Sequence, residues 1–322
     1  MRPPRRALLA APLLAASFQA WAQDWPSRPI RWIVPYPPGG PADIMGRLAA
    51  QQVAYRLGVT VVVENRSGAS GTVGAEIVRQ AAPDGQTFLC APSVHVMARH
   101  VLPAVPYDPV TDFVPVARFG QGPLLLVANA ARVPGETLRE ALPALRSRPR
   151  DFAFGVSALG AANHLAVLEF NRLTGLDLLL VTYRGSAPAL ADLMAGQVSL
   201  MIDPIIGMLP HVREGRLRAL AVTAPRRSAV TPNIPTAAEA GLPGLEFFSW
   251  YGVWGPAGLP APMIERVNAA LVAAAQDPGL VARLAGLGFE AVGESPTEFA
   301  AYIGRDVARN VALLRAANFR PE

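Results

Sequence analysis

Hydrophobic positions along the chain form short runs that alternate with longer stretches of helical spacing. The run "IRWIV" at 30–34 predicts a strand, and the apolar side chains of 43–58 share one helical face, opposite Arg47, Gln51 and Arg56. The short runs lack strict apolar–polar alternation, which is typical of parallel strands buried on both faces. The pattern therefore predicts an α/β fold with a largely parallel sheet.

The alternation of strands and helices continues to the end of the chain. Further strands are predicted at 59–65, 87–91, 124–128, 152–155, 178–182, 199–202, 218–222 and 249–256. Further helices are predicted at 73–81, 136–146, 161–173, 186–195, 204–213, 261–276, 279–286 and 296–316.

Two segments without such patterns divide these elements into two α/β units. Segment 103–115 is rich in Pro, and 224–248 is rich in Pro, Gly and Ala, so both are predicted to be connections. We expect one lobe at 23–122, to which about 249–322 returns, and a second lobe at 123–248. The carboxyl ends of the strands then face the cleft between the lobes, where open α/β sheets bind ligands.

The chain passes between the expected lobes twice, near 115–123 and 245–250. We expect these crossovers to form the hinge of a monomer that closes on its ligand.

The N-terminal segment 1–22 has the pattern of a secretory signal peptide. Arg2, Arg5 and Arg6 precede a short apolar run, and "AWA" at 20–22 has the small–x–small form of a cleavage site. The run is too short to span a membrane. We expect export to the periplasm by the Sec route. The twin-arginine route is the alternative, because the adjacent arginines loosely resemble a twin-arginine signal.

Composition excludes several classes of function. Removal of the three arginines of the signal peptide would lower the formal net charge from +5 to +2. The sequence also lacks a stripe of basic residues interleaved with aromatic ones, which would indicate nucleic-acid binding. Cys90 is the only cysteine, which rules out an intramolecular disulfide. All 29 basic residues are arginine, so a P-loop, a pyridoxal-phosphate Schiff base and a Ser-x-x-Lys nucleophile are excluded.

The turn "VPYPPGGPAD" at 34–43 is the first candidate binding element. Gly39 and Gly40 would let a ligand approach the backbone, and the free amides of the following helix would attract an anion. The alternative is a plain strand-to-helix turn with Asp43 as the helix N-cap. The residues of the turn leave both interpretations open.

Four long motifs carry a resemblance to a known family. They are "WPSRPIRWIVPYPPGGPADIMGRLAA", "VVVENRSGASGTVGAEIVRQAAPDGQTFL", "VTYRGSAPALADLMAGQVSLMID" and "IPTAAEAGLPGLEFFSWYGVWGPAGLP". In this order they resemble the Bug-type substrate-binding proteins of tripartite tricarboxylate transporters. The resemblance implies a two-lobed receptor with the type II periplasmic-binding-protein fold, which binds a small organic carboxylate without a cofactor and delivers it to a large and a small membrane subunit.

The resemblance also implies which residues hold the ligand. They belong to the first-lobe turn, to the end of strand 87–91, to the loop 155–164, to the loop after strand 178–182 and to the end of strand 199–202. The residues are Tyr36, Pro38, Gly39, Gly40, Asp43, Ser93, Ser157, Gly160, Ala161, His164, Arg184, Gly185 and Asp203.

Several of these residues have a structural alternative. His164 is expected to cap or pack at the start of a helix, whereas the position of Arg184 at a strand end favours the cleft over the surface. Asp203 has the alternative of capping the next helix, and Ser93 that of a turn residue. Trp250, Tyr251 and Trp254 are expected in the core or at the interface between the lobes rather than as a stacking platform for a ligand.

The chain departs from the family pattern in the loop 155–164. Val156 and Ala161 occupy places where many members have serine, although Ser157 is adjacent. Pro41 and Ala42 also replace residues that are common in the first turn. Fewer hydroxyl donors predict that a monocarboxylate, or a carboxylate with a sizeable apolar body, binds better than citrate.

Two other functions are alternatives to a transport receptor. A secreted hydrolase is disfavoured because the chain has no Gly-x-Ser-x-Gly and no His-Glu-x-x-His motif, and its four scattered histidines make a poor zinc set. We therefore expect a protein that is not an enzyme and binds no metal. A ligand-sensing protein of the same fold, acting through a signalling receptor, stays open as an alternative.

Overall fold

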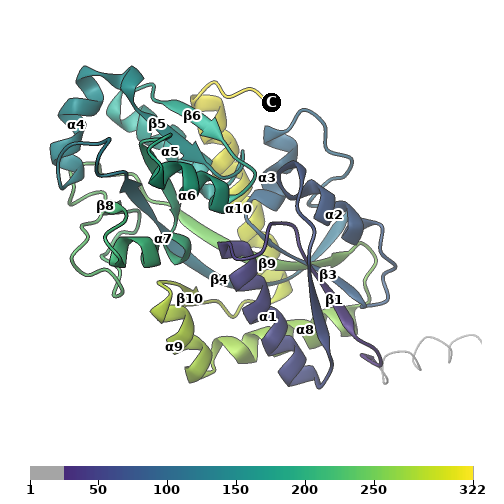
Figure 1. The fold of residues 1–322 in the computed structure, drawn as a ribbon. Coiled ribbons are helices and arrows are strands. Elements are labelled where there is room, and N and C mark those ends of the chain that lie inside the picture. The colour runs from purple at the N-terminus through teal and green to yellow at the C-terminus, as the bar shows by residue number, and fades with distance from the viewer. Residues whose placement is uncertain (1–24, 322) are drawn as a thin grey trace, which may run out of the picture.

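The computed structural model describes residues 25–321 (Figure 1). The signal peptide predicted at 1–22 and its route of export lie outside these residues. Across 25–321, no helix is both long enough and apolar enough to cross a bilayer. Strands and helices alternate along the chain and build two lobes, which confirms the predicted α/β class.

The first lobe is built on three parallel strands in the order β2-β1-β3. Its elements are β1 (Ile30–Val34), α1 (Pro41–Leu57), β2 (Val61–Asn65), a 3₁₀ turn at Ala69–Gly71, α2 (Thr72–Arg79), β3 (Thr87–Pro92) and α3 (Val94–Val101). Trp32 of β1 and Phe88 of β3 are completely buried, and they pack in one cluster with Met45 and Leu48 of α1. The apolar face predicted for this helix therefore covers the sheet.

The second lobe repeats this arrangement with parallel strands in the order β7-β5-β6. Its elements are α4 (Leu138–Ser147), a 3₁₀ turn at Pro149–Asp151, β5 (Ala153–Val156), α5 (Ala162–Thr174), β6 (Leu179–Thr182), α6 (Ser186–Met194), β7 (Leu200–Pro204), α7 (Ile205–Arg213) and β8 (Arg218–Val222). Phe154 of β5 and Phe170 of α5 meet edge to face, with ring centroids 5.2 Å apart. These elements match the predicted ones to within a few residues.

Two long strands join the lobes into one continuous sheet. β4 (Phe113–Ala128) and β9 (Phe248–Pro256) pair with each other in antiparallel fashion through the middle of the molecule (Figure 1). β9 also pairs with β3 of the first lobe, and β4 with β7 and β8 of the second. The sheet is therefore mixed, and the segments expected to be hinge crossovers lie within or beside these paired strands.

The first half of β4 corrects the sequence prediction. The connection predicted at 103–115 ends earlier, because β4 already begins at Phe113, and the strand predicted at 124–128 is only the end of β4. Pro115 and Pro123 obscured the strand pattern, since proline interrupts a hydrogen-bonded ladder. The ladder accommodates Pro115 by a shift in register beside it, and a second shift lies beside Gly120.

The C-terminal elements pack on both faces of the sheet around β4. They are α8 (Ala261–Ala275), α9 (Pro278–Gly286), the short β10 (Glu290–Ala291), which pairs with β4, and α10 (Pro296–Ala316). α8 and α9 lie on one face of the sheet and α10 on the other. α8 packs on α1 and β4, whereas α10 contacts β4 together with α3 and α5. The last helix therefore touches both lobes (Figure 1).

Candidate functional site

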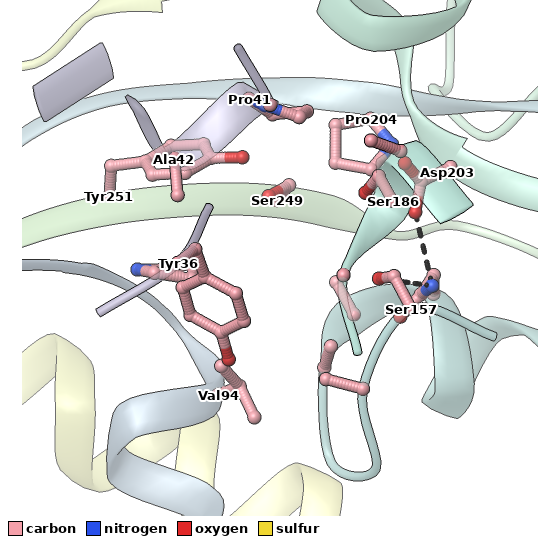
Figure 2. Close-up of a pocket in the computed structure, with 18 of the residues that line it drawn as sticks. Tyr36, Pro41, Ala42, Val94, Ser157, Ser186, Asp203, Pro204, Ser249 and Tyr251 are labelled. Carbon is pink, nitrogen blue, oxygen red and sulfur yellow. Dashed lines mark hydrogen bonds between the residues drawn. The ribbon is translucent and has the colours of Figure 1, made fainter. Parts of the chain in front are cut away.

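A pocket lies between the two lobes at the carboxyl ends of the parallel strands (Figure 2). The first lobe supplies the β1–α1 turn and the β3–α3 junction, the second supplies the starts of α5, α6 and α7, and β9 supplies Ser249 and Tyr251. The lining residues are Tyr36, Pro37, Pro38, Gly40, Pro41, Ala42, Pro92, Ser93, Val94, Ser157, Ala158, Ala161, Ala162, Asn163, Gly185, Ser186, Ala187, Asp203, Pro204, Ser249 and Tyr251. The position is the one expected for open α/β sheets.

The lobes touch each other around this pocket. A Cβ atom on Gly185 would lie 3.5 Å from Cδ of Pro37 in the first lobe. The contact at Gly160 is tighter, because a Cβ atom there would come within 2.7 Å of Cγ2 of Val101 on α3. Gly160 also has a φ of +76°, so both space and backbone conformation require glycine at this interlobe contact.

The N-terminal ends of five helices converge on the pocket. The N-cap residue of each helix is also a lining residue, and these residues are Gly40 for α1, Ser93 for α3, Ala161 for α5, Gly185 for α6 and Pro204 for α7. First-turn amides have no partner within their own helix, and a helix N-terminus carries roughly half a positive charge. The backbone therefore forms a site for an anion.

These five N-caps make no side-chain hydrogen bond to their helices. Away from the pocket, Thr137, Asp277 and Ser295 cap α4, α9 and α10 through their side chains, whereas α2 and α8 have no such cap. A capping side chain would occupy an amide that a ligand needs. The helices at the pocket thus keep donors directed at the space between the lobes.

Asp203 is the one charged side chain among the lining residues, and no arginine or histidine of the described chain lines the pocket with it. Arg184, expected in the cleft, is exposed and lies outside the lining, although Gly185 and Ser186 directly after it belong to it. The positive potential of the pocket therefore comes from backbone dipoles instead of a guanidinium group.

Asp203 is completely buried at the end of β7. Its Oδ1 accepts a hydrogen bond of 3.0 Å from Nδ2 of Asn163, while Oδ2 has no hydrogen-bond partner within residues 25–321 (Figure 2). Burial raises the pKa of Asp203 to about 7, although the nearby hydroxyls of Ser186 and Ser157 and the amide of Asn163 favour the ionised form. The carboxyl group therefore titrates near neutrality inside the pocket.

Asn163 organises the polar wall of the second lobe. Its Nδ2 also donates to Oγ of Ser157 at 2.8 Å, and its Oδ1 accepts from the amide of His164 at 2.8 Å. Both amide hydrogens and the oxygen of Asn163 are thus engaged. Ser157 accepts from Asn163 and keeps its own hydroxyl hydrogen for Asp203 or a ligand.

Asp43 shapes the first-lobe turn without lining the pocket. The N-cap of α1 is Gly40, which corrects the alternative that Asp43 is the cap. The Asp43 carboxylate accepts from the amide of Gly39 at 3.0 Å, from Nε of Arg47 at 3.0 Å and from Nδ2 of Asn65 at 2.9 Å. Burial opposes ionisation, but these donors outweigh it and lower the pKa of Asp43.

The two glycines of this turn differ in conformation. Gly39 has a φ of +80°, which favours glycine, whereas Gly40 has φ −82° and ψ 171°, which any residue adopts. No atom other than the Pro37 carbonyl oxygen, at 3.9 Å, would approach a Cβ on Gly40. Gly39 thus sets the turn, and Gly40 leaves open space beside the pocket.

His164 supports the second-lobe loop from outside the pocket. It is buried, its Nδ1 accepts from the amide of Gly160 at 3.1 Å, and its ring meets that of Phe319 with centroids 5.0 Å apart. Burial lowers the pKa of His164 to about 4, so the ring is neutral and able to accept. The structure shows His164 packed in this way and holding the loop at Gly160, whereas the N-cap of α5 is Ala161, without a side-chain hydrogen bond.

The structure places the expected site residues in two groups. Tyr36, Pro38, Gly40, Ser93, Ser157, Ala161, Gly185 and Asp203 line the pocket, whereas Gly39, Asp43, Gly160, His164 and Arg184 do not. Sequence reasoning missed Asn163, Ser186, Ser249 and the pocket-facing Tyr251. Asn163 and Ser186 lie in the first turns of helices that follow strands, and that position was the available signal.

The expected shortage of hydroxyl groups is smaller than the loop 155–164 indicated. Val156 is buried in the core, so a serine in its place would not line the pocket here. Ser93, Ser157, Ser186 and Ser249 all line it. The rest of the wall consists mainly of proline and alanine, which suits the aliphatic or aromatic body of a ligand.

Trp250 and Trp254 are almost completely buried and pack with Phe299, which confirms the expected core role. In the part of the chain that the structure describes, no three His, Cys, Asp or Glu side chains lie close enough together to hold a metal ion.

A model of the family described as "Tripartite tricarboxylate transporter family receptor" matches residues 45–319. A Pseudomonas protein named "UPF0065 protein in tcbD-tcbE intergenic region" is 39% identical over 91% of this chain and 88% of its own length. Protein BugT of Bordetella pertussis is 35% identical over 91% of this chain and 90% of its own length.

Solved structures with the same fold extend this similarity. The R. palustris protein Rpa4515 with adipate aligns with a TM-score of 0.90 and 35% identity, over 93% of this chain and 100% of its own. The periplasmic binding protein BugD aligns with a TM-score of 0.86 and 31% identity, over 92% of this chain and 100% of its own. MatC from Rhodopseudomonas palustris with bound malate aligns with a TM-score of 0.83 and 33% identity, over 90% of this chain and 100% of its own. The two-lobed periplasmic-binding-protein fold is therefore confirmed.

Proposed function

The chain belongs to the family of tripartite tricarboxylate transporter receptors, and from this premise we propose that it captures a small organic carboxylate between its lobes in the periplasm. It then delivers this ligand to the large and small membrane subunits of a transporter of that type. The family and the adipate- and malate-bound neighbours support the receptor role, and the family description supports the transport step.

The observation that carries this proposal is the convergence of five helix N-termini on a pocket lined by no cation of the described chain. Such a site suits an anion small enough to be held by amides and hydroxyls. Micromolar affinity corresponds to about −8 kcal/mol, which several charge-assisted hydrogen bonds and a desolvated ligand body supply together.

We further propose that the preferred ligand has an apolar body. Citrate brings three carboxylates, and each buried charge needs donors because an unpaired one is costly. The pocket offers proline and alanine methylene and methyl groups over much of its wall, and Arg184 lies outside it. Burial of apolar ligand surface contributes roughly 25 cal/mol per Å². The adipate bound by a neighbour has a four-carbon apolar chain between its carboxylates, in keeping with this preference.

Isothermal titration calorimetry at one pH and salt concentration tests both statements. The panel contains adipate, malate, citrate, an acidic amino acid and an aromatic carboxylate. We expect adipate or the aromatic carboxylate to bind at least tenfold more tightly than citrate. Tightest binding of citrate or the acidic amino acid would refute the apolar preference alone, and no binding of any member would refute the carboxylate receptor.

The receptor is proposed to release its ligand unchanged. The polar groups facing the pocket are serines, an asparagine, two tyrosines and one buried carboxyl group, and Nδ1 of the neighbouring His164 accepts from the Gly160 amide. Within the described residues, no histidine lines the pocket to activate one of these serines as a nucleophile. Incubation with esters, amides and phosphate esters should give no product, and turnover of any of these would contradict the proposal.

A further inference from the structure

Asp203 has one carboxyl oxygen without a partner in the wall of the pocket. Oδ1 accepts from Asn163, but Oδ2 is buried and has no hydrogen-bond partner within residues 25–321. Asn163 has no hydrogen left to offer, because its second one goes to Ser157. Asp203 belongs to the lining of the pocket, and the hydroxyls of Ser157 and Ser186 lie near the same carboxyl group.

Second-lobe groups around Asp203 supply no positive charge. On α5, His164 is neutral and its Nδ1 accepts from the Gly160 amide, so it adds no positive charge. Before α6, Arg184 is exposed and does not line the pocket, and Tyr183 donates its hydroxyl to Asp192. Across the sheet, β4 presents Leu125 opposite Asp203, and α7 begins with two isoleucines.

First-lobe and β9 groups are neutral or already paired. Tyr251 of β9 stays protonated, because burial raises its pKa and the negative charge of Asp203 adds to this. Tyr36 donates its hydroxyl to the carbonyl of Ser70. The Asp43 carboxylate of α1 accepts hydrogen bonds from Gly39, Arg47 and Asn65. The charge of Arg47 is therefore already paired with Asp43.

An anionic ligand would therefore meet a second anionic group in a pocket to which residues 25–321 contribute no cationic side chain. Two carboxylates in one desolvated site repel each other, and the usual outcome is that one proton is shared between them. Five helix N-termini with roughly half a positive charge each compensate the two charges of a dicarboxylate better than those two plus a third on Asp203. Burial already brings the titration of Asp203 close to neutrality, so the energetic cost of protonating it at pH 7 is small.

We propose that Asp203 binds a ligand carboxylate as a neutral acid, donating a hydrogen bond from Oδ2 to a ligand oxygen, so that binding at pH 8 takes up close to one proton from solvent. This inference rests on the proposed carboxylate receptor. Proton uptake makes the protein a receptor for the ligand and a proton together, with tighter binding at lower pH. The neutral carboxyl group would also contribute to specificity, because it favours ligands that place a hydrogen-bond acceptor beside Asp203.

The first test measures adipate binding, with malate as a second probe, by calorimetry between pH 6.5 and 8.5. Both ions are ionised throughout this range, so the ligand itself contributes little to the pH dependence. We expect affinity to fall roughly 20-fold from pH 6.5 to 8.5, because the fraction of neutral Asp203 falls by about that factor. Titrations at pH 8 in buffers of different ionisation enthalpy should report uptake of close to one proton.

Asp203→Asn provides the decisive variant. Its amide keeps an acceptor for Asn163 and a donor in place of Oδ2, without a titrating group. The variant should bind adipate more tightly than the wild type at pH 8.5 and show a flat pH profile. Asp306→Asn is the matched control, since Asp306 is a half-buried carboxyl whose pKa burial also raises, but it bonds Trp250 outside the pocket. This control should keep the wild-type slope.

Three outcomes would overturn the inference. They are a flat wild-type profile, the wild-type slope in folded Asp203→Asn, and no proton uptake in the buffer series. The buffer series uses wild type alone, so it decides the question even if the variant does not fold. Failure of adipate and malate to bind at any pH would instead remove the proposed ligand class and this inference with it.

Discussion

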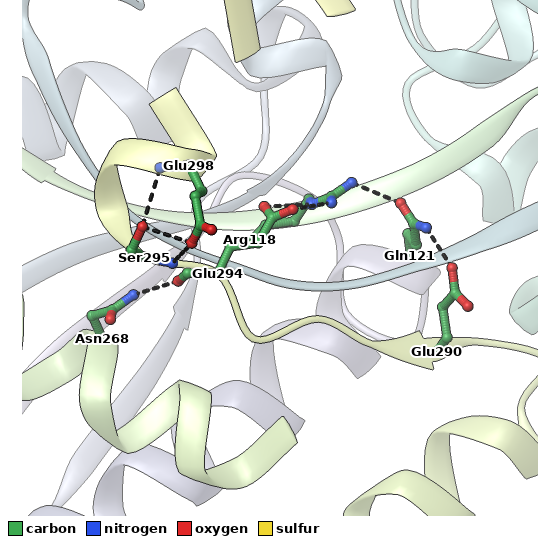
Figure 3. Close-up of polar contacts among 7 residues, drawn as sticks. All are labelled: Arg118, Gln121, Asn268, Glu290, Glu294, Ser295 and Glu298. Carbon is green, nitrogen blue, oxygen red and sulfur yellow. Dashed lines mark hydrogen bonds and ion pairs between the residues drawn. The ribbon is translucent and has the colours of Figure 1, made fainter. Parts of the chain in front are cut away.

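Arg118 and Glu294 form a two-pronged ion pair that joins β4 to the segment leading into α10 (Figure 3). The Arg118 side chain is 8% exposed, and its guanidinium group lies 3.6 Å from the centroid of the Tyr302 ring. Gln121 accepts a further hydrogen bond from Arg118 and donates one to Glu290. The network links the start of the C-terminal helix α10 to β4, the strand that joins the two lobes.

Arg118→Ala should lower the free energy of unfolding by about 3 kcal/mol, because it leaves Glu294 and Gln121 without their partner and removes the contact with Tyr302. Urea denaturation followed by tryptophan fluorescence measures this loss. Arg172→Ala is the matched control, since Arg172 pairs in the same two-pronged way with Glu169 but is 51% exposed. The control should cost less than about 1 kcal/mol. Equal small losses in both variants would contradict a structural role for the network.

The adjacent glycines of the first turn should respond differently to substitution. Gly39→Ala places a side chain at φ +80° and should destabilise the fold by about 1 kcal/mol, although no neighbour obstructs the new methyl group. Gly40→Val should leave stability nearly unchanged but weaken ligand binding at least tenfold, because this residue lines the pocket and begins α1. Thermal unfolding and calorimetry separate the two effects. Wild-type affinity in folded Gly40→Val would show that α1 does not bind the ligand.

His164 should make stability depend on pH between its two pKa values. Burial lowers the folded pKa to about 4, whereas the unfolded value is about 6.5. Below pH 6.5 the unfolded chain therefore binds a proton that the folded chain does not, and stability falls as the pH drops towards 4. His164→Gln should remove this loss, which amounts to about 1.4 kcal/mol per pH unit within the window.

The measurement for His164 is the difference between variant and wild type at pH 7 and pH 4.5. Asp203 has the opposite sign, because its folded pKa is raised, so the wild-type slope alone does not report on His164. His100→Gln serves as the control, since His100 is exposed and should give a smaller difference. An equal difference in the two histidine variants would contradict this assignment.

Local patterns were sufficient to predict the parallel strands and most helices. Strands such as β1 and β7 are short apolar runs bounded by turn residues, and α1 carries its apolar positions on one face. β4 was only partly predicted, because its prolines and glycines lie in a ladder whose stability comes from β9, far away in sequence. α3 was not predicted; six of its eight residues are buried, and this burial depends on neighbouring elements.

The site divides in the same way. Residues in turns after strands, such as Ser157 and Gly185, were identifiable because ligands bind where such turns meet. Ser249 and Tyr251 lie inside β9, and nothing in their local sequence indicates which side of the strand faces the pocket. Asp43 and His164 were associated with the right loops, but their role in holding Gly39 and Gly160 depends on hydrogen-bond geometry.

The pairing of β9 with β3 has a consequence for the order in which the protein folds. β3 belongs to the first third of the chain, yet one of its edges is covered only when Trp254 and its neighbours in β9 arrive. Until then the N-terminal lobe has an open strand edge, which is prone to pairing with other chains. Contacts so distant in sequence also form slowly. We therefore expect the nascent N-terminal lobe to remain incomplete, and dependent on protection from aggregation, until β9 has been synthesised.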